Sequence, residues 1–236
     1  MRLLLSTILL LFSSASSAEQ LIIHTEEYSP LSFTENGQIK GIATEQVVLI
    51  MSKANIDYVM KVYPWARAYK TTETNKNTCV FTTSNTPERA NLFKWVEPLS
   101  LNTSVLVKLK SSNITLSSLD EAKKYKIGIQ NQDVAGVYLK DHGFTQLDSA
   151  NDADKSIKKL KANRVDMVAM AESRLIAMVN DGQPVEKAID IFAIKMGLAC
   201  NKSVKDETIV KLQFQLDQLI ADGTQKKIME KYQSKK

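Results

Sequence analysis

Short apolar runs alternate with amphipathic stretches along most of the chain. Apolar residues that recur at spacings of three and four, as at Val47, Ile50, Met51 and Ala54, predict a helix with one face on a sheet. Compact runs of apolar and β-branched residues predict strands. In order, these patterns predict a strand at 20–24, a helix at 44–54, a strand at 58–63, a helix at 65–76 opened by Pro64, and a strand at 79–83.

A second series of the same kind begins near Lys126. It predicts a strand at 126–130, a helix at 134–140, a strand at 144–147, a helix that includes 156–161, and a strand at 165–170. Strands that alternate with helices imply largely parallel sheets with right-handed crossovers. The sequence therefore predicts two α/β units, each a largely parallel sheet flanked by helices.

The C-terminal segment, 203–232, is predicted to be helical. Ser203 and Asp206 resemble a capping box at its start, and Gly223 is predicted to end a first helix. One apolar stripe runs along the segment, formed by Ile209, Leu212, Leu216, Leu219 and Ile220.

The first residues, 1–18, have the order of a secretory signal peptide. Arg2 precedes an apolar run at 3–12, and small residues lead to Ala18. The run is shorter than the ~20 residues of a membrane span. We expect cleavage after Ala18 and a mature protein free in the periplasm, with a retained anchor as the alternative.

The charge pattern excludes nucleic acid as a partner. The formal charge is +5 at pH 7, but Lys and Arg are scattered among Asp and Glu, and no basic cluster is interleaved with aromatic residues. A small positive surplus favours anionic ligands. His24 and His142 lie far from each other and from both cysteines in the sequence, so we expect no metal site and no cofactor.

The chain has two cysteines, Cys79 and Cys200. An oxidising compartment favours a disulfide between a lone pair of this kind. The alternative is that each is a small buried hydrophobic residue.

Several segments, taken in order, resemble a known family. They are 27–33 (EYSPLSF), 41–43 (GIA), 86–89 (TPER), Phe93, 97–98 (EP), 126–128 (KIG), 163–166 (NRVD), 197–199 (GLA), 222–223 (DG) and 231–232 (KY). In this order they resemble the bacterial extracellular solute-binding proteins, family 3, which serve ABC importers of amino acids. The resemblance covers nearly all of the chain after the signal peptide.

The resemblance implies the two-lobed periplasmic-binding-protein fold of type II. Lobe 1 would be discontinuous, 19–103 plus 196–236, and lobe 2 would be 104–195, with a hinge of two crossing segments. A small carboxylate-bearing ligand would bind between the lobes, and a hinge motion would close them. The implied partner is a membrane ABC permease or a sensor protein, and we expect a monomer.

Arg89 matches the family's arginine that binds the ligand's α-carboxylate. A guanidinium suits this role because its planar donors match a carboxylate in a bidentate pair. The alternative is a surface arginine at the start of a helix. At the end of the same strand, Thr82 and Ser84 are expected to add hydroxyl or backbone donors, and Ser84 is the stronger candidate.

Tyr28 and Trp65 fall where the family often places aromatic walls, and their flat faces would flank a ligand there. Taken alone, each is also typical of core or rim packing. Arg67 lies within 63–68, a stretch that resembles a less characterised subgroup of these receptors. We include Arg67 as a further candidate contact.

Lobe 2 departs from the amino-acid-binding pattern. Family members that hold an α-ammonium usually carry an acid where this chain has Ala171. The adjacent Glu172 is the candidate substitute, and the alternative is an exposed acid favoured by a helix dipole. The loop after the strand at 126–130 lacks the family's Ser or Thr, and Asp133 there is predicted to be a helix N-cap. Recognition of an α-ammonium is therefore left open.

The leading hypothesis is a solute-binding protein that is not an enzyme. An exported dehydratase-like enzyme on the same fold would need a positioned acid or base, for which the candidates are Glu172, Asp133, His24 and His142. A regulatory partner that binds no solute would be favoured if side chains filled the crevice.

Overall fold

The computed structural model describes residues 20–233, and the predicted signal peptide with its cleavage site lies outside them. The strands are β1 Leu21–Thr25, β2 Phe33–Glu35, β3 Gln38–Lys40, β4 Tyr58–Val62, β5 Thr78–Ser84, β6 Phe93–Leu109, β7 Ile127–Gln130, β8 Leu147–Ala150, β9 Met167–Ala171 and β10 Val185–Asn201. The helices are α1 Ile42–Ala54, α2 Trp65–Thr74, α3 Pro87–Ala90, the 3-10 helix η1 Leu119–Lys124, α4 Val134–Asp141, α5 Ala153–Lys161, α6 Glu172–Asn180, α7 Asp206–Ala221 and α8 Thr224–Gln233.

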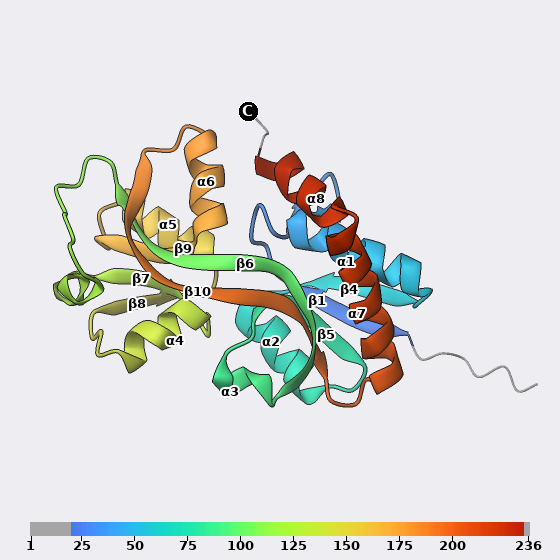
Figure 1. Ribbon diagram of the computed structural model, residues 1–236. Helices are drawn as coiled ribbons and strands as arrows, with labels where there is room; N and C mark the ends of the chain where they lie inside the picture. Colours follow the sequence, from blue (N-terminus) through green and yellow to red (C-terminus); the bar gives the residue numbers. More distant parts are fainter. Residues whose placement is uncertain (1–19, 234–236) are drawn as a thin grey trace, which may run out of the picture.

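One eight-stranded sheet runs through both lobes in the order β4-β1-β5-β10-β6-β9-β7-β8. At one end β1 pairs in parallel with β4 and β5, and at the other end β7 pairs in parallel with β8 and β9. Helices cover both ends, as Figure 1 shows. The predicted two-lobed α/β fold with largely parallel units is confirmed.

The long strands β6 and β10 connect the lobes. They pair antiparallel along their whole length, from Phe93 opposite Asn201 to Leu109 opposite Val185. Figure 1 shows them crossing side by side from one lobe to the other. The expected lobe boundaries, 103/104 and 195/196, fall inside these strands. The length of these strands and their continuous pairing were not predicted; the two crossing segments form one ribbon.

A bulge in β10 lies near this crossing. The register with β6 shifts between Met196 and Leu198. A Cβ atom on the intervening Gly197 would lie 2.9 Å from the Val96 carbonyl oxygen, so only glycine fits there. Bulges bend a strand and increase its twist. The close approach of the two backbones therefore depends on a residue without a side chain.

Two local predictions were wrong. β8 begins at Leu147, because Phe144 is buried in the lobe 2 core instead of extending as a strand. It follows Gly143 at φ 82 and packs back on α4, and its N–H donates to the Leu139 carbonyl oxygen. Ser203 does not cap α7 either, since its hydroxyl accepts from the Asn77 N–H.

The predicted helical stripes lie in the lobe 1 core. Val47, Ile50 and Met51 of α1 are fully buried. From α7, Leu212, Leu216 and Leu219 are also fully buried, whereas Ile220 is 39% exposed. Helices α1 and α7 pack on the same face of the sheet, so residues far apart in the sequence build one core. No helix within 20–233 is long and apolar enough to cross a membrane.

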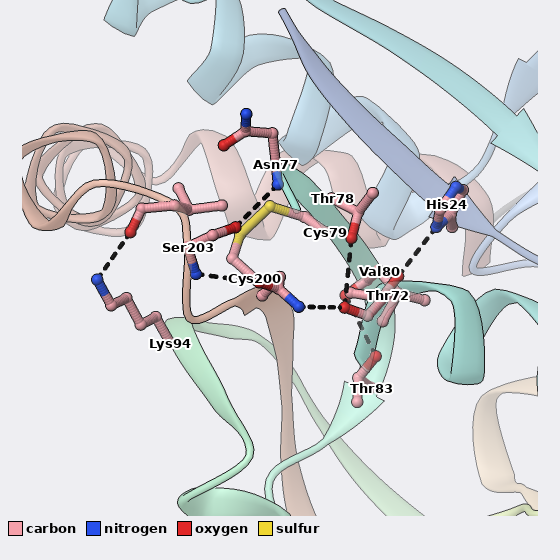
Figure 2. The surroundings of a disulfide bond; sticks show 12 residues. His24, Thr72, Asn77, Thr78, Cys79, Val80, Thr83, Lys94, Cys200 and Ser203 are labelled. Carbon is pink, nitrogen blue, oxygen red and sulfur yellow. Dashed lines mark hydrogen bonds between the residues drawn. A yellow bond between two sulfur atoms is a disulfide. The ribbon is translucent and has the colours of Figure 1, made fainter. Parts of the chain in front are cut away.

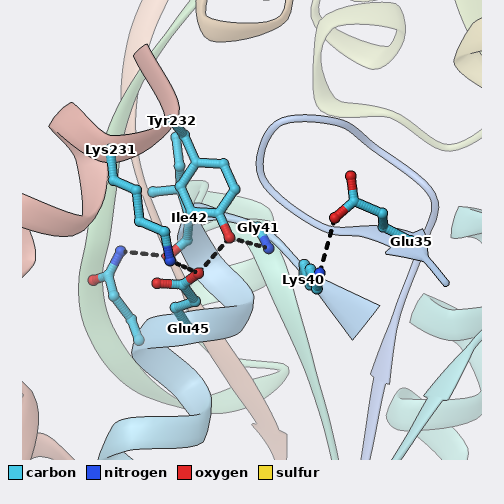
Figure 3. Close-up of polar contacts among 8 residues, drawn as sticks. Glu35, Lys40, Gly41, Ile42, Glu45, Lys231 and Tyr232 are labelled. Carbon is cyan, nitrogen blue, oxygen red and sulfur yellow. Dashed lines mark hydrogen bonds and ion pairs between the residues drawn. The ribbon is translucent and has the colours of Figure 1, made fainter. Parts of the chain in front are cut away.

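The last helix is fastened to the start of α1, as Figure 3 shows. The Tyr232 hydroxyl accepts from the Gly41 N–H at 3.1 Å and donates to Glu45, and Lys231 pairs with the same carboxylate at 2.6 Å. Gly41 has φ 129, and a Cβ there would lie 2.4 Å from the Leu31 carbonyl oxygen. This close approach to Leu31 therefore requires a residue without a side chain at position 41. Tyr232 holds α8 against α1 through its hydrogen bonds.

A disulfide joins Cys79 to Cys200, which confirms the expected bond (Figure 2). The cysteines are register partners on β5 and β10, and both are fully buried. Beside them the Asn201 side chain donates to the carbonyl oxygens of Thr72 and Glu73 at 2.9 Å. The bond closes a sequence separation of 121 residues, which includes all of lobe 2.

Removal of the disulfide should destabilise the protein strongly. Loops of about 100 residues lose much conformational freedom when closed, and native disulfides typically stabilise by about 2–5 kcal/mol. We expect the variant Cys79→Ala/Cys200→Ala to lose that much unfolding free energy in urea titrations followed by circular dichroism. Reductant should bring the wild type to the same value and leave the variant unchanged. Equal stability with and without the bond would contradict this expectation.

Candidate ligand-binding site

A crevice lies between the lobes, at the carboxyl ends of β1 and β5 and beside the β6 and β10 crossing. This is where ligands bind in open parallel sheets. Its walls come from lobe 1, from the two crossing strands, and from lobe 2 at the start of α4 and the end of β9. The residues that line it are Glu26, Tyr28, Trp65, Thr82, Ser84, Arg89, Asn102, Ser104, Asp133, Val134, Ala171 and Met196.

Most of the predicted site residues meet in this crevice. Arg89, Ser84, Tyr28, Trp65 and Thr82 all line it, although 61 positions in the sequence separate Tyr28 from Arg89. The structure therefore gathers three segments of lobe 1, the loop after β1, the start of α2 and the end of β5 with α3, at one place.

Two predicted residues lie elsewhere. Glu172 does not line the crevice, because its carboxylate pairs with Lys187 at 2.9 Å. Arg67 is exposed, and its guanidinium lies 4.1 Å from the centre of the Tyr63 ring. Thr86, which begins the motif at 86–89, accepts the Arg89 N–H through its carbonyl oxygen and is the N-cap residue of α3.

The end of β5 has an unusual backbone. Thr82 has φ 61 and is only 7% exposed. A β-branched residue rarely adopts this left-handed conformation, and such strain concentrates at functional sites. All residues of β5 are buried, so the surrounding packing holds Thr82 in place. The strained position lies directly before Thr83 and Ser84, where the strand reaches the crevice.

Arg89 is a buried cation in the crevice wall. It is 8% exposed, and its Nη2 donates to the Gln132 carbonyl oxygen at 3.0 Å. The guanidinium also lies over the Tyr69 ring at 4.8 Å and near the Trp65 ring at 5.7 Å. A buried charge is costly unless it is paired. Here the partners are one carbonyl group and two aromatic faces, and Arg89 forms no ion pair within residues 20–233, although its charge acts on the nearby Asp133 carboxyl.

The same Gln132 carbonyl oxygen accepts from Trp65 Nε1 at 3.0 Å. One acceptor of lobe 2 thus receives donors from two residues of lobe 1. The free space inside the crevice is about 20 Å³, which holds about one water molecule. A solute therefore enters only if the lobes separate and these two hydrogen bonds break.

Tyr28 makes a second contact between the lobes. Its hydroxyl accepts from the Ala171 N–H at 2.9 Å, and the Arg174 guanidinium lies 4.9 Å from its ring centre. Arg174 also donates to the Ser29 carbonyl oxygen at 3.4 Å and pairs with Asp154. Burial raises the pKa of the Tyr28 hydroxyl, so it stays neutral.

Glu26 lines the crevice, although the sequence did not predict it as a site residue. It is 7% exposed, and its Oε2 accepts from Gln130 Nε2 of lobe 2. Burial raises its pKa to about 8; the hydrogen bond from Gln130 opposes this shift, nearby Asp133 adds to it, and Arg174 opposes it. Its position directly after β1 could have marked it as a candidate, because the carboxyl ends of parallel strands face such crevices.

Asp133 has two roles. Its carboxylate accepts from the Ala135 N–H at 3.1 Å, which confirms the predicted N-cap of α4. It also lines the crevice. Burial raises the pKa of Asp133, and the Arg89 charge lowers it. The crevice therefore holds two acids, Glu26 and Asp133, beside one buried arginine.

The histidines lie away from the crevice. His24 is buried where β1 meets α2, its Nδ1 is 2.9 Å from the Thr72 hydroxyl, and burial lowers its pKa. His142 stacks on Tyr138 at 3.8 Å. Among residues 20–233, no group of His, Cys, Asp and Glu is arranged to hold a metal ion.

A two-lobed α/β fold with a polar crevice between the lobes defines a binding protein of the periplasmic kind. Residues 21–235 match the bacterial extracellular solute-binding proteins, family 3, and the chain belongs to this family. The family predicted from the sequence motifs is therefore confirmed.

Individual relatives agree. The chain is 25% identical over 239 residues to the probable amino-acid-binding protein YxeM of Bacillus subtilis strain 168, covering 93% of this chain and 87% of the relative. The arginine-, lysine-, histidine-binding protein ArtJ of Geobacillus stearothermophilus has a similar structure, with TM-score 0.82, 17% identity, and coverage of 92% and 96%. A histidine kinase sensor domain with similarity to periplasmic binding proteins has TM-score 0.83, 15% identity and the same coverage. The two structures support the fold alone.

The raised pKa of Glu26 makes stability depend on pH. Its folded pKa of about 8 exceeds the ordinary 4.5, so the folded protein keeps a proton that the unfolded chain releases between these values. The contribution of Glu26 to the free energy of unfolding is therefore fully present below pH 4.5. It is lost as the pH rises towards 8, by up to about 1.4 kcal/mol per pH unit. We expect Glu26→Gln to gain stability over the wild type from pH 5 to 8 in melting curves.

The matched control is Glu27→Gln, because the adjacent Glu27 is exposed and accepts from the Thr34 N–H outside the crevice. Its melting temperature should follow that of the wild type across the same pH range. A stability difference for Glu26→Gln that does not change with pH would contradict the raised pKa.

Proposed function

We propose that the mature protein, 19–236, captures a small carboxylate-bearing solute, an amino acid or a related molecule, for an ABC importer. The binding lobes are 19–103 plus 196–236 and 104–195, and the solute lies between them. The protein acts as a monomer in the periplasm after cleavage at Ala18. The observation that carries this proposal is the buried guanidinium of Arg89 in the crevice wall, which forms no ion pair within residues 20–233.

A carboxylate would take the position that the Gln132 carbonyl oxygen holds in the closed crevice. Both are oxygen acceptors, and both satisfy the donors of Arg89 and Trp65. A carboxylate adds the charge that the carbonyl lacks, and charge-assisted hydrogen bonds are about twice as strong as neutral ones. Ser84 and Thr82 supply further donors from β5, while Tyr28 and Trp65 flank the solute.

The names of the relatives support an amino acid as the solute. YxeM is a probable amino-acid-binding protein, and ArtJ binds arginine, lysine and histidine. We propose that this chain catalyses no reaction on its ligand. Two acids that could act in catalysis, Glu26 and Asp133, do face the crevice, so this point needs a direct test. Ligand incubated with the protein should be recovered unchanged.

A second candidate function is a regulatory or sensory partner that binds no solute. The specific observation in its favour is the small free space in the crevice, about 20 Å³. The sensor domain of a histidine kinase has the same fold. The two candidates differ in whether the crevice must open: a protein that captures a solute has to open it, and a partner that binds no solute does not.

A thermal-shift screen of the mature protein against amino acids, small organic acids and peptides separates these candidates. A ligand at 100 times its dissociation constant stabilises the folded state by about 2.7 kcal/mol. We expect at least one carboxylate-bearing compound to raise the melting temperature. A screen in which none of these compounds raises the melting temperature would contradict the proposed function.

Substitution of Arg89 should weaken binding of the screened ligand at least tenfold. The reason is the loss of a bidentate, charged pair, in which each hydrogen bond contributes about 1.5–3 kcal/mol. Arg89→Lys should be nearly as harmful as Arg89→Ala, because an ammonium keeps the charge but lacks the planar fork. Calorimetric titration of both variants measures the effect.

Arg67→Ala is the matched control, because it removes the same charge from an exposed position on lobe 1. Its affinity should stay close to that of the wild type. Melting curves without ligand should show that all the variants fold. If both Arg89 variants bind as tightly as the wild type, Arg89 is not the carboxylate anchor.

A further inference from the structure

The crevice holds more acidic groups than basic ones. Glu26 and Asp133 line it together with Arg89. None of the three belongs to an ion pair in the part of the chain that the structure describes. With Glu26 protonated, a solute with a carboxylate alone would add a second negative charge, beside Asp133, to a site with one cation, Arg89. Buried charges need compensation, so such a solute would be poorly matched.

The acid position expected in lobe 2 offers no carboxylate. It falls on Ala171, whose N–H donates to the Tyr28 hydroxyl. The neighbouring Glu172 is engaged by Lys187 and does not reach the crevice. A positive group on the solute must therefore find its partner elsewhere in the crevice.

Glu26 has the features that such a partner needs. It comes from lobe 1, at the end of β1, and is held in place by the Gln130 side chain of lobe 2. That hydrogen bond uses Oε2, and Oε1 accepts none from residues 20–233. Asp133 is less suited, because its carboxylate is already used to cap α4.

We infer that the solute is a zwitterion and that Glu26 is the residue that binds its ammonium group. Arg89 then binds the carboxylate, so both charges of the solute are anchored on lobe 1. The assignment rests on the proposed function. It moves recognition of the ammonium from the lobe 2 position at 171 to the strand end of β1.

Binding of an ammonium should release a proton from the site. Burial keeps the Glu26 carboxyl protonated near neutral pH in the closed crevice, and its charged or titratable neighbours are Asp133, Arg174, Asp152 and Tyr28. An ammonium beside it favours the ionised form. A solute without an ammonium gives no such release.

The experiment uses matched pairs of probes, each an amino acid and the same acid without its α-amino group. Three pairs are L-glutamine with glutaramate, L-arginine with 5-guanidinopentanoate, and L-leucine with 4-methylpentanoate. Calorimetric titration of the full mature protein gives a preference ratio, the dissociation constant of the acid over that of the amino acid. The proteins compared are the wild type, Glu26→Gln, Asp133→Asn and the control Glu27→Gln.

For at least one pair we expect a wild-type ratio of tenfold or more, and Glu26→Gln should reduce it at least tenfold with little change in affinity for the acid. Glutamine keeps the size of the side chain and its contact with Gln130. Glu27→Gln should keep the wild-type ratio, and Asp133→Asn should lower it less than Glu26→Gln does. Titrations of the wild type in two buffers of different ionisation enthalpy should show proton release for the amino acid alone.

Several results would overturn the assignment. If the acids bind as well as the amino acids and depend on Arg89, the proposed function stands and the role of Glu26 fails. The same holds if only Asp133→Asn lowers the ratio, or if the wild type releases no proton. If no member of any pair binds, the proposed amino-acid ligand fails and the assignment of Glu26 fails with it.

Discussion

β6 and β10 pair along their whole length, so the two lobes share one sheet and are joined by a ribbon of two strands. Every other feature of the site depends on this pairing. It places the carboxyl ends of β1 and β5 opposite the start of α4, and it leaves the lobes free to separate by bending. The Cys79–Cys200 bond fixes β10 to β5 on the lobe 1 side, so bending is confined to the crossing itself.

Several polar contacts hold the crevice closed. The Gln132 carbonyl accepts from Trp65 and Arg89, the Tyr28 hydroxyl accepts from Ala171, and Gln130 donates to Glu26. Hydrogen bonds that form in place of bonds to water contribute about 0.5–1.5 kcal/mol each. Such contacts are strong enough to favour closure and weak enough for a charged solute to replace them, which is the balance that reversible capture needs.

The sequence predicted the local elements well, because helices and strands in this chain follow clear periods. Five candidate binding residues that it named line the crevice, because motif context marks the ends of β1 and β5 and the start of α2: Arg89, Ser84, Tyr28, Trp65 and Thr82. It did not predict the full length of β6 and β10. These strands pass from one core to another and contain Pro98 and several polar residues, so no single alternation of burial runs through them.

Glu26 shows what a sequence leaves out: an acid beside another acid after a strand is typical of a solvated loop, whereas in the fold Glu26 is buried in the crevice and bonded to Gln130 of lobe 2. The most direct test is a crystal structure of the mature protein with the amino acid that it binds most tightly. We expect the carboxylate on Arg89, in the place of the Gln132 carbonyl oxygen, and the ammonium within hydrogen-bond distance of Glu26. An amino acid bound outside the crevice, or with its ammonium away from Glu26 and its carboxylate away from Arg89, would contradict it.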